Sequence, residues 1–202
     1  MRKWTAALAL AILCVSVSSA QDKPIRTIKD GALDEIKLYA EKPAASQRVV
    51  MRRFSATDAD IVNGEKKDET KTMQADGPRM LAEQFASKLK ELGTFTDVAV
   101  IDSAAAAPSD ALLVEGKFTE LDPGSRAKRY FAGFGAGKSA VTIEGSITGA
   151  DGKLIATFAH RRIGVMGAFG GDSLGKLAAD TKDLGEDVAK FLNAWATGKK
   201  LK

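Results

Sequence analysis

The sequence predicts an α+β fold, a two-layer sandwich in which a mixed sheet of about five strands packs on two amphipathic helices. Two segments carry apolar residues at the three- and four-residue spacing of a helix with one buried face. Five others carry the short apolar runs or alternating patterns that are typical of strands. Their chain order is strand, helix, strand, then three consecutive strands, then a helix, and we see no internal repeat. 

The first predicted strand covers residues 48–54 and the polar residues 55–77 are expected to form a long solvated loop. The first helix is expected to begin at Pro78, capped by Asp76 or Gly77, because a proline in the first turn loses no hydrogen bond. Gly93 is expected to end it. Its apolar stripe consists of Met80, Leu81, Phe85, Leu89 and Leu92.

The remaining strands are predicted at residues 95–101, 111–121, 139–148 and 153–161. The first strand, the helix and the strand 95–101 should form a right-handed crossover, which makes the two strands parallel. Asp151-Gly152 lies between two alternating runs and predicts a tight hairpin. The last strands should therefore form an antiparallel meander, and Asp122-Pro123-Gly124 a turn.

The last helix is predicted from about Ser173 to Trp195. Its buried seam alternates in steps of four and three residues, which indicates packing along its whole length. The seam consists of Leu177, Thr181, Leu184, Val188, Phe191 and Trp195.

Residues 1–20 have the features of a signal peptide. Arg2 and Lys3 precede a short apolar run, and the small residues up to Ala20 predict cleavage before Gln21. The apolar run is too short to span a bilayer well. Leu13 stands where a lipoprotein signal wants a small residue before Cys14, so lipidation is not expected. The sequence therefore predicts export to a bacterial periplasm, with no transmembrane span after cleavage.

The domain organisation that we predict is a signal peptide (1–20), an N-terminal extension (21–46), one globular domain (47–197) and a basic tail (198–202). Within the extension, Ile36, Leu38 and Tyr39 favour a short strand or turn. Loss of the leader lowers the basic residues from 30 to 28, against 26 acidic residues. This near-balance argues against nucleic-acid binding driven by bulk charge. One histidine argues against a multi-histidine metal site, and the mature chain has no cysteine for disulfide or thiol chemistry. We expect no cofactor and no metal.

Two patterns resemble catalytic or phosphate-binding motifs, and each lacks a requirement. Gly171-Asp172-Ser173-Leu174-Gly175 fits a nucleophile elbow, but the single histidine, His160, precedes Ser173 instead of following it. Capping of the last helix explains Asp172 or Ser173 better, so an esterase-type serine hydrolase that uses Ser173 is only the alternative function. The glycines before Lys138-Ser139 resemble a phosphate-binding loop, but Ala132 replaces a required glycine and a strand follows.

His160 closes a strand, and packing or backbone bonding explains it better than a role as a catalytic base. Glu115, Glu120 and Glu144 offer a carboxylate pair for glycoside cleavage in principle, but outward-facing strand charges explain them better.

Residues 125–137 form a segment that we call the basic aromatic loop. It contains Arg126, Lys128, Arg129, Tyr130, Phe131 and Phe134, interleaved with glycines. Such a loop is suited to binding an envelope protein or an anionic envelope surface. Alternatively its aromatic residues fold back as a lid on the core, and Glu115, Glu120 and Asp122 pair with its cations. The sequence does not separate these readings.

At this loop the chain resembles the bacterial family called domain of unknown function 4410. The resemblance rests on Leu113–Gly116, on Leu121–Arg129 and on Gly133–Lys138, and extends over about residues 46–197. Members of that family are exported, many as lipoproteins, and have no established reaction. The resemblance implies a small envelope domain without a catalytic residue. The function that we expect is that of a periplasmic accessory protein whose partner contacts the basic aromatic loop.

Overall fold

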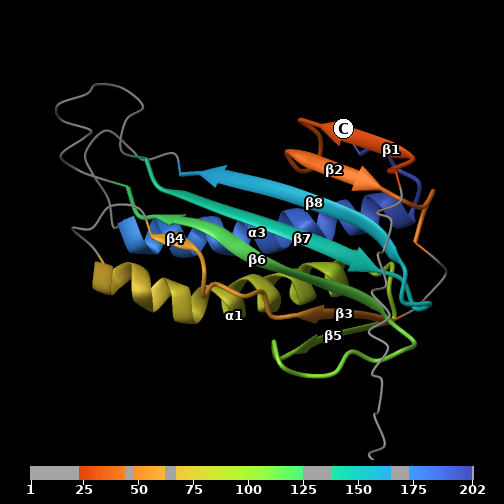
Figure 1. Ribbon diagram of the computed structural model, residues 1–202, viewed down its shortest axis with the longest axis horizontal. Coiled ribbons are helices and arrows are strands. Elements are labelled where there is room, and N and C mark those ends of the chain that lie inside the picture. Colours follow the sequence, from red (N-terminus) through yellow and green to blue (C-terminus); the bar gives the residue numbers. More distant parts are fainter. Residues whose placement is uncertain (1–22, 44–47, 62–66, 125–137, 165–172, 202) are drawn as a thin grey trace, which may run out of the picture.

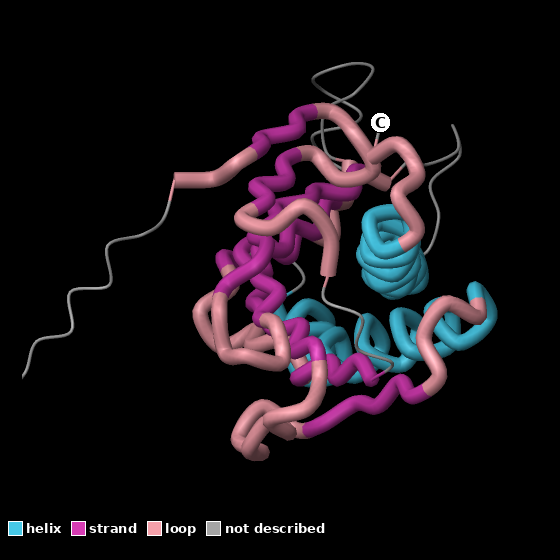
Figure 2. The backbone as a smooth tube through the Cα atoms, turned by 90° about the vertical axis from the view of Figure 1, so that its right-hand side faces the viewer, coloured by secondary structure: helices cyan, strands magenta, loops and turns pink. Residues whose placement is uncertain are grey.

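A computed structural model describes residues 23–43, 48–61, 67–124, 138–164 and 173–201. Its architecture is a mixed sheet covered on one face by two helices, α1 (Lys67–Leu92) and α3 (Ser173–Ala196). Figure 2 shows both helices on the same side of the strands. The predicted two-layer α+β fold is therefore confirmed. None of the helices in the described ranges is both long and apolar enough to cross a membrane.

The sheet has seven strands along its main path, in the order β1-β2-β8-β7-β6-β3-β5 (Figure 1). The strands are β1 (Arg26–Lys29), β2 (Glu35–Leu38), β3 (Arg48–Arg52), β5 (Asp97–Ile101), β6 (Leu112–Asp122), β7 (Ala140–Thr148) and β8 (Leu154–Ile163). The two-residue β4 (Asp60–Ile61) pairs beside β6, off this path. The prediction of about five strands was therefore too low, because it left out β1 and did not count the short strand or turn expected at Ile36–Tyr39, where β2 lies.

Strand directions follow the predicted connections. β3 is parallel to β5 and to β6, as expected for the crossover through α1. The strands β6, β7 and β8 form the predicted antiparallel meander. The hairpin between β7 and β8 closes with a 2.8 Å bond from the Gly149 N–H to the Lys153 carbonyl, and Gly152 takes a φ of 78° there. A left-handed residue at this position favours glycine, which explains the Asp-Gly pair.

The N-terminal extension is part of the fold, which corrects the predicted boundary at residue 46. β2 pairs with β8 from Glu35↔Ala159 to Leu38↔Ala156, and β1 pairs with β2. Leu33 and Ile36 are completely buried. Leu201 of the predicted tail is also buried, and its carbonyl accepts the Ala32 N–H at 3.0 Å. These short segments form strands because they cover apolar surface that β8 and α3 would otherwise expose.

The helix α1 begins at Lys67, eleven residues before Pro78, so the predicted start of this helix and the extent of the loop 55–77 were wrong. Pro78 lies inside the helix and cannot bond to the carbonyl four residues earlier, which costs about 3 kcal/mol. Tertiary contacts offset this cost. Met73 and Thr70 are buried, and the Gln74 side chain donates to the carbonyls of Ala56 and Thr57 at 2.6 and 3.1 Å.

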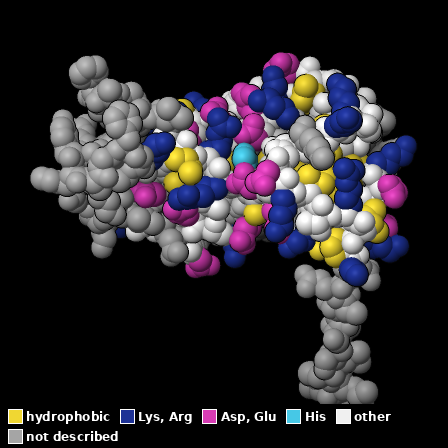
Figure 3. Space-filling model, turned by 90° about the horizontal axis from the view of Figure 1, so that it is seen from above, with side chains coloured by type: hydrophobic (Ala, Val, Ile, Leu, Met, Phe, Trp, Pro, Cys, Tyr) yellow, Lys and Arg dark blue, Asp and Glu magenta, His cyan; other side chains and the backbone are white. Residues whose placement is uncertain are grey.

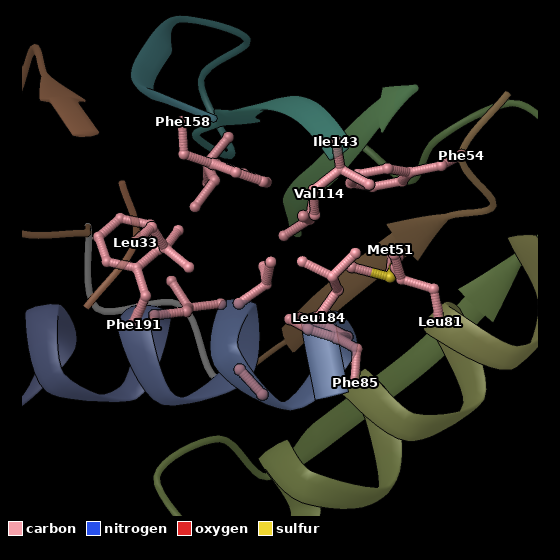
Figure 4. Close-up of a cluster of buried hydrophobic side chains, with 14 of the residues drawn as sticks. Leu33, Met51, Phe54, Leu81, Phe85, Val114, Ile143, Phe158, Leu184 and Phe191 are labelled. Atoms are coloured by element: carbon pink, nitrogen blue, oxygen red, sulfur yellow. The ribbon is translucent and has the colours of Figure 1, made fainter. Parts of the chain in front are cut away.

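Both helix seams pack on the sheet as predicted (Figure 4). Leu81, Phe85 and Leu89 of α1 are fully buried, and the whole seam of α3 from Leu177 to Trp195 is buried. The ring of Phe191 stacks on Trp195 with centroids 5.9 Å apart and lies 6.2 Å from the ring of Phe158 on β8. This single core joins the two ends of the molecule.

Candidate functional site

The six residues predicted to bind a partner (Arg126, Lys128, Arg129, Tyr130, Phe131 and Phe134) lie outside the described residues. The ends of their segment are described. β6 ends at Asp122, β7 begins at Ala140, and these two residues are paired across the strands. The Gly124 N–H donates to Asp122 Oδ1 at 2.7 Å, and Gly124 has a φ of 76°. Segment 125–137 thus connects two adjacent strand ends.

A second segment begins beside it. Ile163, the last residue of β8, pairs with Ala140, and the Gly164 N–H donates to the Ser139 carbonyl at 2.8 Å. The described residues Gly164 and Ser139, which adjoin the two segments in the chain, therefore lie side by side. We call the described residues that flank both segments the loop end of the molecule (Figure 1).

A buried polar cluster holds the loop end together. Asp180 of α3 is 2% exposed; its carboxylate accepts from Ser139 Oγ at 3.3 Å and from Lys176 Nζ at 3.2 Å. A Cβ on Gly164 would collide with the side chains of Ser139 and Asp180. A buried carboxylate is tolerated only when it is paired and hydrogen-bonded. This cluster therefore ties the start of β7, the end of β8 and α3 to one geometry.

On the open face of the sheet, a row of three paired residues crosses the loop end. Glu120, Thr142 and Arg161 are neighbours in the strand registers of β6, β7 and β8. Arg161 donates two hydrogen bonds to Glu120, at 2.9 and 3.0 Å, and Thr142 donates a third at 2.7 Å. The bonds from Arg161 first, and then from Thr142, hold the pKa of Glu120 below its usual value although burial opposes this. The pKa of Arg161 is raised mainly by the same pair.

On the helix face, Arg162 binds two carboxylates of α3. Its distances are 2.5 Å to Asp187 Oδ2 and 2.9 Å to Asp183 Oδ2. His160 donates from Nε2 to Asp187 at 3.2 Å, and its Nδ1 lies 3.3 Å from Asp34 Oδ1 without hydrogen-bond alignment. Burial raises the pKa of Asp187, but the hydrogen bonds from His160 and Arg162 outweigh burial and the pKa is lowered. Arg161 and Arg162 thus extend to opposite faces and both are paired.

The arrangement around His160 does not suit a catalytic base. A base needs one ring nitrogen free to take a proton from the nucleophile. Both nitrogens of His160 face carboxylates, those of Asp34 and Asp187, and the side chain is 13% exposed. Ser173 is the first residue of α3, and residues 164–172 separate it from β8. A nucleophile elbow instead places its serine in a sharp turn directly after a strand.

The other carboxylates that were considered for catalysis are also paired. Glu115 Oε2 lies 2.5 Å from Arg52, and Glu144 Oε2 lies 3.7 Å from Lys117. Glu115 and Glu144 line a shallow hollow of about 530 Å³ on the open sheet face. In the part of the chain that is described, no cluster of three or more His, Asp and Glu side chains is arranged to hold a metal ion.

The glycine motif before Lys138-Ser139 leads into a strand, as predicted, because β7 begins at Ala140. A phosphate-binding loop would instead open a helix, whose first N–H groups bind the phosphate.

Asp34, Asp180, Asp183 and Asp187 were not identified from the sequence. Their partners on other elements are between 21 and 127 residues away along the chain, although Asp180 and Asp187 also have Lys176 and Lys190 one helical turn away. The three acidic residues of α3 lie on the side of the helix that faces β8 and the start of β7. From a sequence, charged residues of an amphipathic helix are usually expected to face solvent. No local signal distinguishes them from solvent-facing charges.

Comparison with known proteins identifies the family. The family model described as "Domain of unknown function (DUF4410)" matches residues 49–168, and the chain belongs to this family. The resemblance seen in the sequence is therefore confirmed. No curated protein matches the chain.

Two kinds of solved structure are similar in fold. The PelC dodecamer from Paraburkholderia phytofirmans has 15% identity and a TM-score of 0.46, with 80% of this chain and 96% of that chain covered. Protein XCC0632 from Xanthomonas campestris, of family DUF330, has 10% identity and a TM-score of 0.47, with 77% and 89% covered. At these values the neighbours give no information about a site or a partner.

Proposed function

We propose that the chain is an exported accessory protein of the bacterial envelope, without catalytic activity, which holds an envelope protein through the basic aromatic loop. In this proposal the sheet is the scaffold and the loop is the binding surface. Binding residues commonly lie on loops that a scaffold positions. Export rests on the signal sequence that ends before Gln21.

The observation that carries the proposal is the pairing of the acidic residues near the loop. If the loop cations were structural, Glu115, Glu120 and Asp122 would be their nearest partners in the sequence. Glu115 is bound to Arg52, and Glu120 is bound to Arg161 and Thr142. These two carboxylates are therefore occupied by groups of the described fold, and Asp122 Oδ1 accepts the Gly124 N–H. This supports a role for Arg126, Lys128 and Arg129 outside the protein, because three cations need either water or an opposite charge.

The absence of catalysis is proposed from the state of the candidate groups. His160 is enclosed by Asp34 and Asp187, and each glutamate considered for glycoside cleavage faces a cation. A purified processed chain should therefore give the same rate with short-chain esters as its Ser173→Ala variant. An ester hydrolysis rate that falls in the variant would favour the serine hydrolase instead.

Crosslinking tests the loop directly. A photocrosslinking amino acid at Tyr130 should capture one envelope protein in cells. Reversal of two cations, Arg126→Glu with Arg129→Glu, should abolish this adduct and leave the melting temperature unchanged. The matched control is Lys90→Glu with Lys182→Glu, which changes the net charge equally at exposed positions of α1 and α3. The control should retain the adduct.

Two outcomes contradict the proposal. If the loop reversal unfolds the protein, the cations have a structural role. If the reversal leaves both the fold and the adduct intact, the loop does not hold the partner.

A further inference from the structure

The far end of the molecule, opposite the loop end, is built from the two ends of the chain. The Ile25 N–H donates to the Leu38 carbonyl at 2.8 Å, which extends the β1–β2 pairing beyond Arg26 at the open end of the hairpin. The indole of Trp195, at the end of α3, donates to the Glu41 carbonyl at 2.9 Å. The carbonyl of Leu201 accepts from Ala32. Hairpin and C-terminal residues therefore form one continuous surface.

Cations gather on this surface, which we call the cationic end. They are Lys23, Arg26, Lys42, Lys199 and Lys200, and all five are exposed. Within the described ranges none of the five has an ion-pair partner, in contrast to Arg161 and Arg162 at the loop end. Glu41 is the acidic residue among them. Unlike Arg161 and Arg162, these cations are available to an external anion.

Three of these cations line a hollow with partly apolar walls. The hollow has a volume of about 440 Å³; Leu38, Trp195 and Leu201 contribute apolar surface, and Arg26, Lys42 and Lys199 contribute charge. Ile25 also lines the hollow. Its side chain is 55% exposed, which makes it the more exposed of the two large hydrophobic side chains that are exposed among the described residues. Figure 3 shows lysine and arginine side chains around apolar patches at this end of the molecule.

We propose that the cationic end binds the surface of an anionic lipid bilayer, with the five cations at the phosphate headgroups and Ile25 at the edge of the acyl region. Peripheral binding of this kind needs unpaired Lys and Arg side chains beside exposed apolar surface, and both are present here. A soluble anion would need only a few cations that converge on one point. The five cations of the cationic end are instead spread over the hairpin and the residues after α3, which suits an extended anionic surface.

The position of the N-terminus supports a membrane as the occupant. Lys23 lies six residues after Val17, the last residue of the apolar segment Ala6–Val17. Six extended residues span at most about 20 Å, so Lys23 lies within this distance of the apolar segment. While the predicted leader is attached, this spacing keeps Lys23 within that distance of the bilayer that such a leader enters. This site is separate from the loop of the proposed function, because α3 spans 24 residues, or about 36 Å, between the two ends.

Vesicle cosedimentation tests the proposal. The chain from Gln21 contains every residue of the described fold, so it is the form to use. It should bind vesicles of phosphatidylcholine with about one-third phosphatidylglycerol, and bind pure phosphatidylcholine weakly. Lys199→Gln with Lys200→Gln should lower the partition coefficient about 25-fold, since each cation near an anionic surface contributes about fivefold. Binding should weaken as salt rises.

Three comparisons make the test specific. Lys138→Gln with Lys182→Gln removes the same charge from exposed positions outside the cationic end and should change binding little. Ile25→Ser should lower the part of the binding that persists at high salt. Arg126→Gln with Arg129→Gln should abolish the Tyr130 adduct but retain vesicle binding, which separates this proposal from the first.

The proposal is overturned if Lys199→Gln with Lys200→Gln binds like the unchanged chain while its melting temperature is also unchanged. It is equally overturned if neutral vesicles bind as strongly, or if only the loop variant loses vesicle binding.

Discussion

Cations at the two ends of this molecule differ in whether they have an ion-pair partner among the described residues. At the loop end, Arg161 and Arg162 extend to opposite faces of β8 and bind carboxylates of β6 and α3. At the cationic end, Lys42, Lys199 and Lys200 are exposed, and Glu41 is the acidic residue among the described residues that line the hollow there. The pairs at the loop end hold strands and a helix together. The cations at the cationic end remain exposed to solvent and to any external anion. A nearly balanced net charge therefore conceals an uneven distribution of paired and unpaired cations, and the two proposals above depend on this difference.

The largest expected effect concerns the core that joins the two ends. Phe191→Ala should lower the free energy of unfolding by about 3–5 kcal/mol, because the ring is fully buried against Phe158 and Trp195. Urea unfolding measures this loss. Lys182→Ala, at an exposed position of the same helix, should change stability by less than about 0.5 kcal/mol. An unchanged midpoint for Phe191→Ala would mean that α3 does not pack on the sheet as described.

The second effect tests whether pairing at the loop end is structural. Asp187→Asn should cost about 1.5–3 kcal/mol at neutral pH, since Arg162 and His160 lose a charged acceptor that is 17% exposed. The pKa of Asp187 is lower in the folded protein than its ordinary value of 3.8. Its contribution is therefore present above about pH 4 and is lost as the pH falls through the folded pKa.

Thermal melts between pH 2 and pH 7 measure this dependence. The unchanged chain should lose stability on acidification more steeply than Asp187→Asn, because the variant has no proton to take up at this position. Parallel profiles would show that the Asp187 pair does not contribute to folding.

A smaller effect is expected at the cationic end from Gly31→Ala. A Cβ on Gly31 would collide with the Leu201 carbonyl oxygen, which also accepts the Ala32 N–H. The collision should cost about 1–3 kcal/mol. It should also displace Leu201 from the hairpin, which faster amide exchange at Ala32 would report. Gly198→Ala would not serve as a control, because Gly198 has a φ of 69°. Thr27→Ala, at an exposed position of β1, is the better one and should leave this exchange unchanged.

The smallest effect sharpens the contrast between paired and unpaired charge. Lys199→Gln with Lys200→Gln should change the free energy of unfolding by less than about 0.5 kcal/mol, since neither side chain has an ion-pair partner among the described residues. Arg161→Gln should cost up to about 1 kcal/mol through loss of the Glu120 pair. Equal costs in chemical denaturation would contradict the difference between the two ends.

Much of the fold could be predicted because its signals are local. The seam of α3, the Asp151-Gly152 hairpin and the meander of β6, β7 and β8 each arise from periodicity or turn chemistry within a short segment. The parallel pairing of β3 with β5 follows from the handedness of the crossover. The family membership also follows from a contiguous run of residues.

The errors occurred where distant contacts override local preference. Pro78 favours a helix start, but buried Met73 and the Gln74 hydrogen bonds extend α1 back to Lys67. The four-residue strands β1 and β2 are too short for a clear pattern, and they form because β8 offers an edge and the core needs Leu33 and Ile36.

By itself the sequence determined the predicted export signal, the α+β class and the composition of the basic aromatic loop, since each depends on neighbouring residues. Only the tertiary structure decided which charges are neutralised. Asp34 lies beside His160, and Glu120 forms an ion pair with Arg161. Residues 23–42 pack beside residues 195–201. No periodicity in the sequence encodes contacts between residues so far apart in the chain. The physical reason is that an ion pair depends on distance in space, and chain folding alone sets which acid lies within 4 Å of which base.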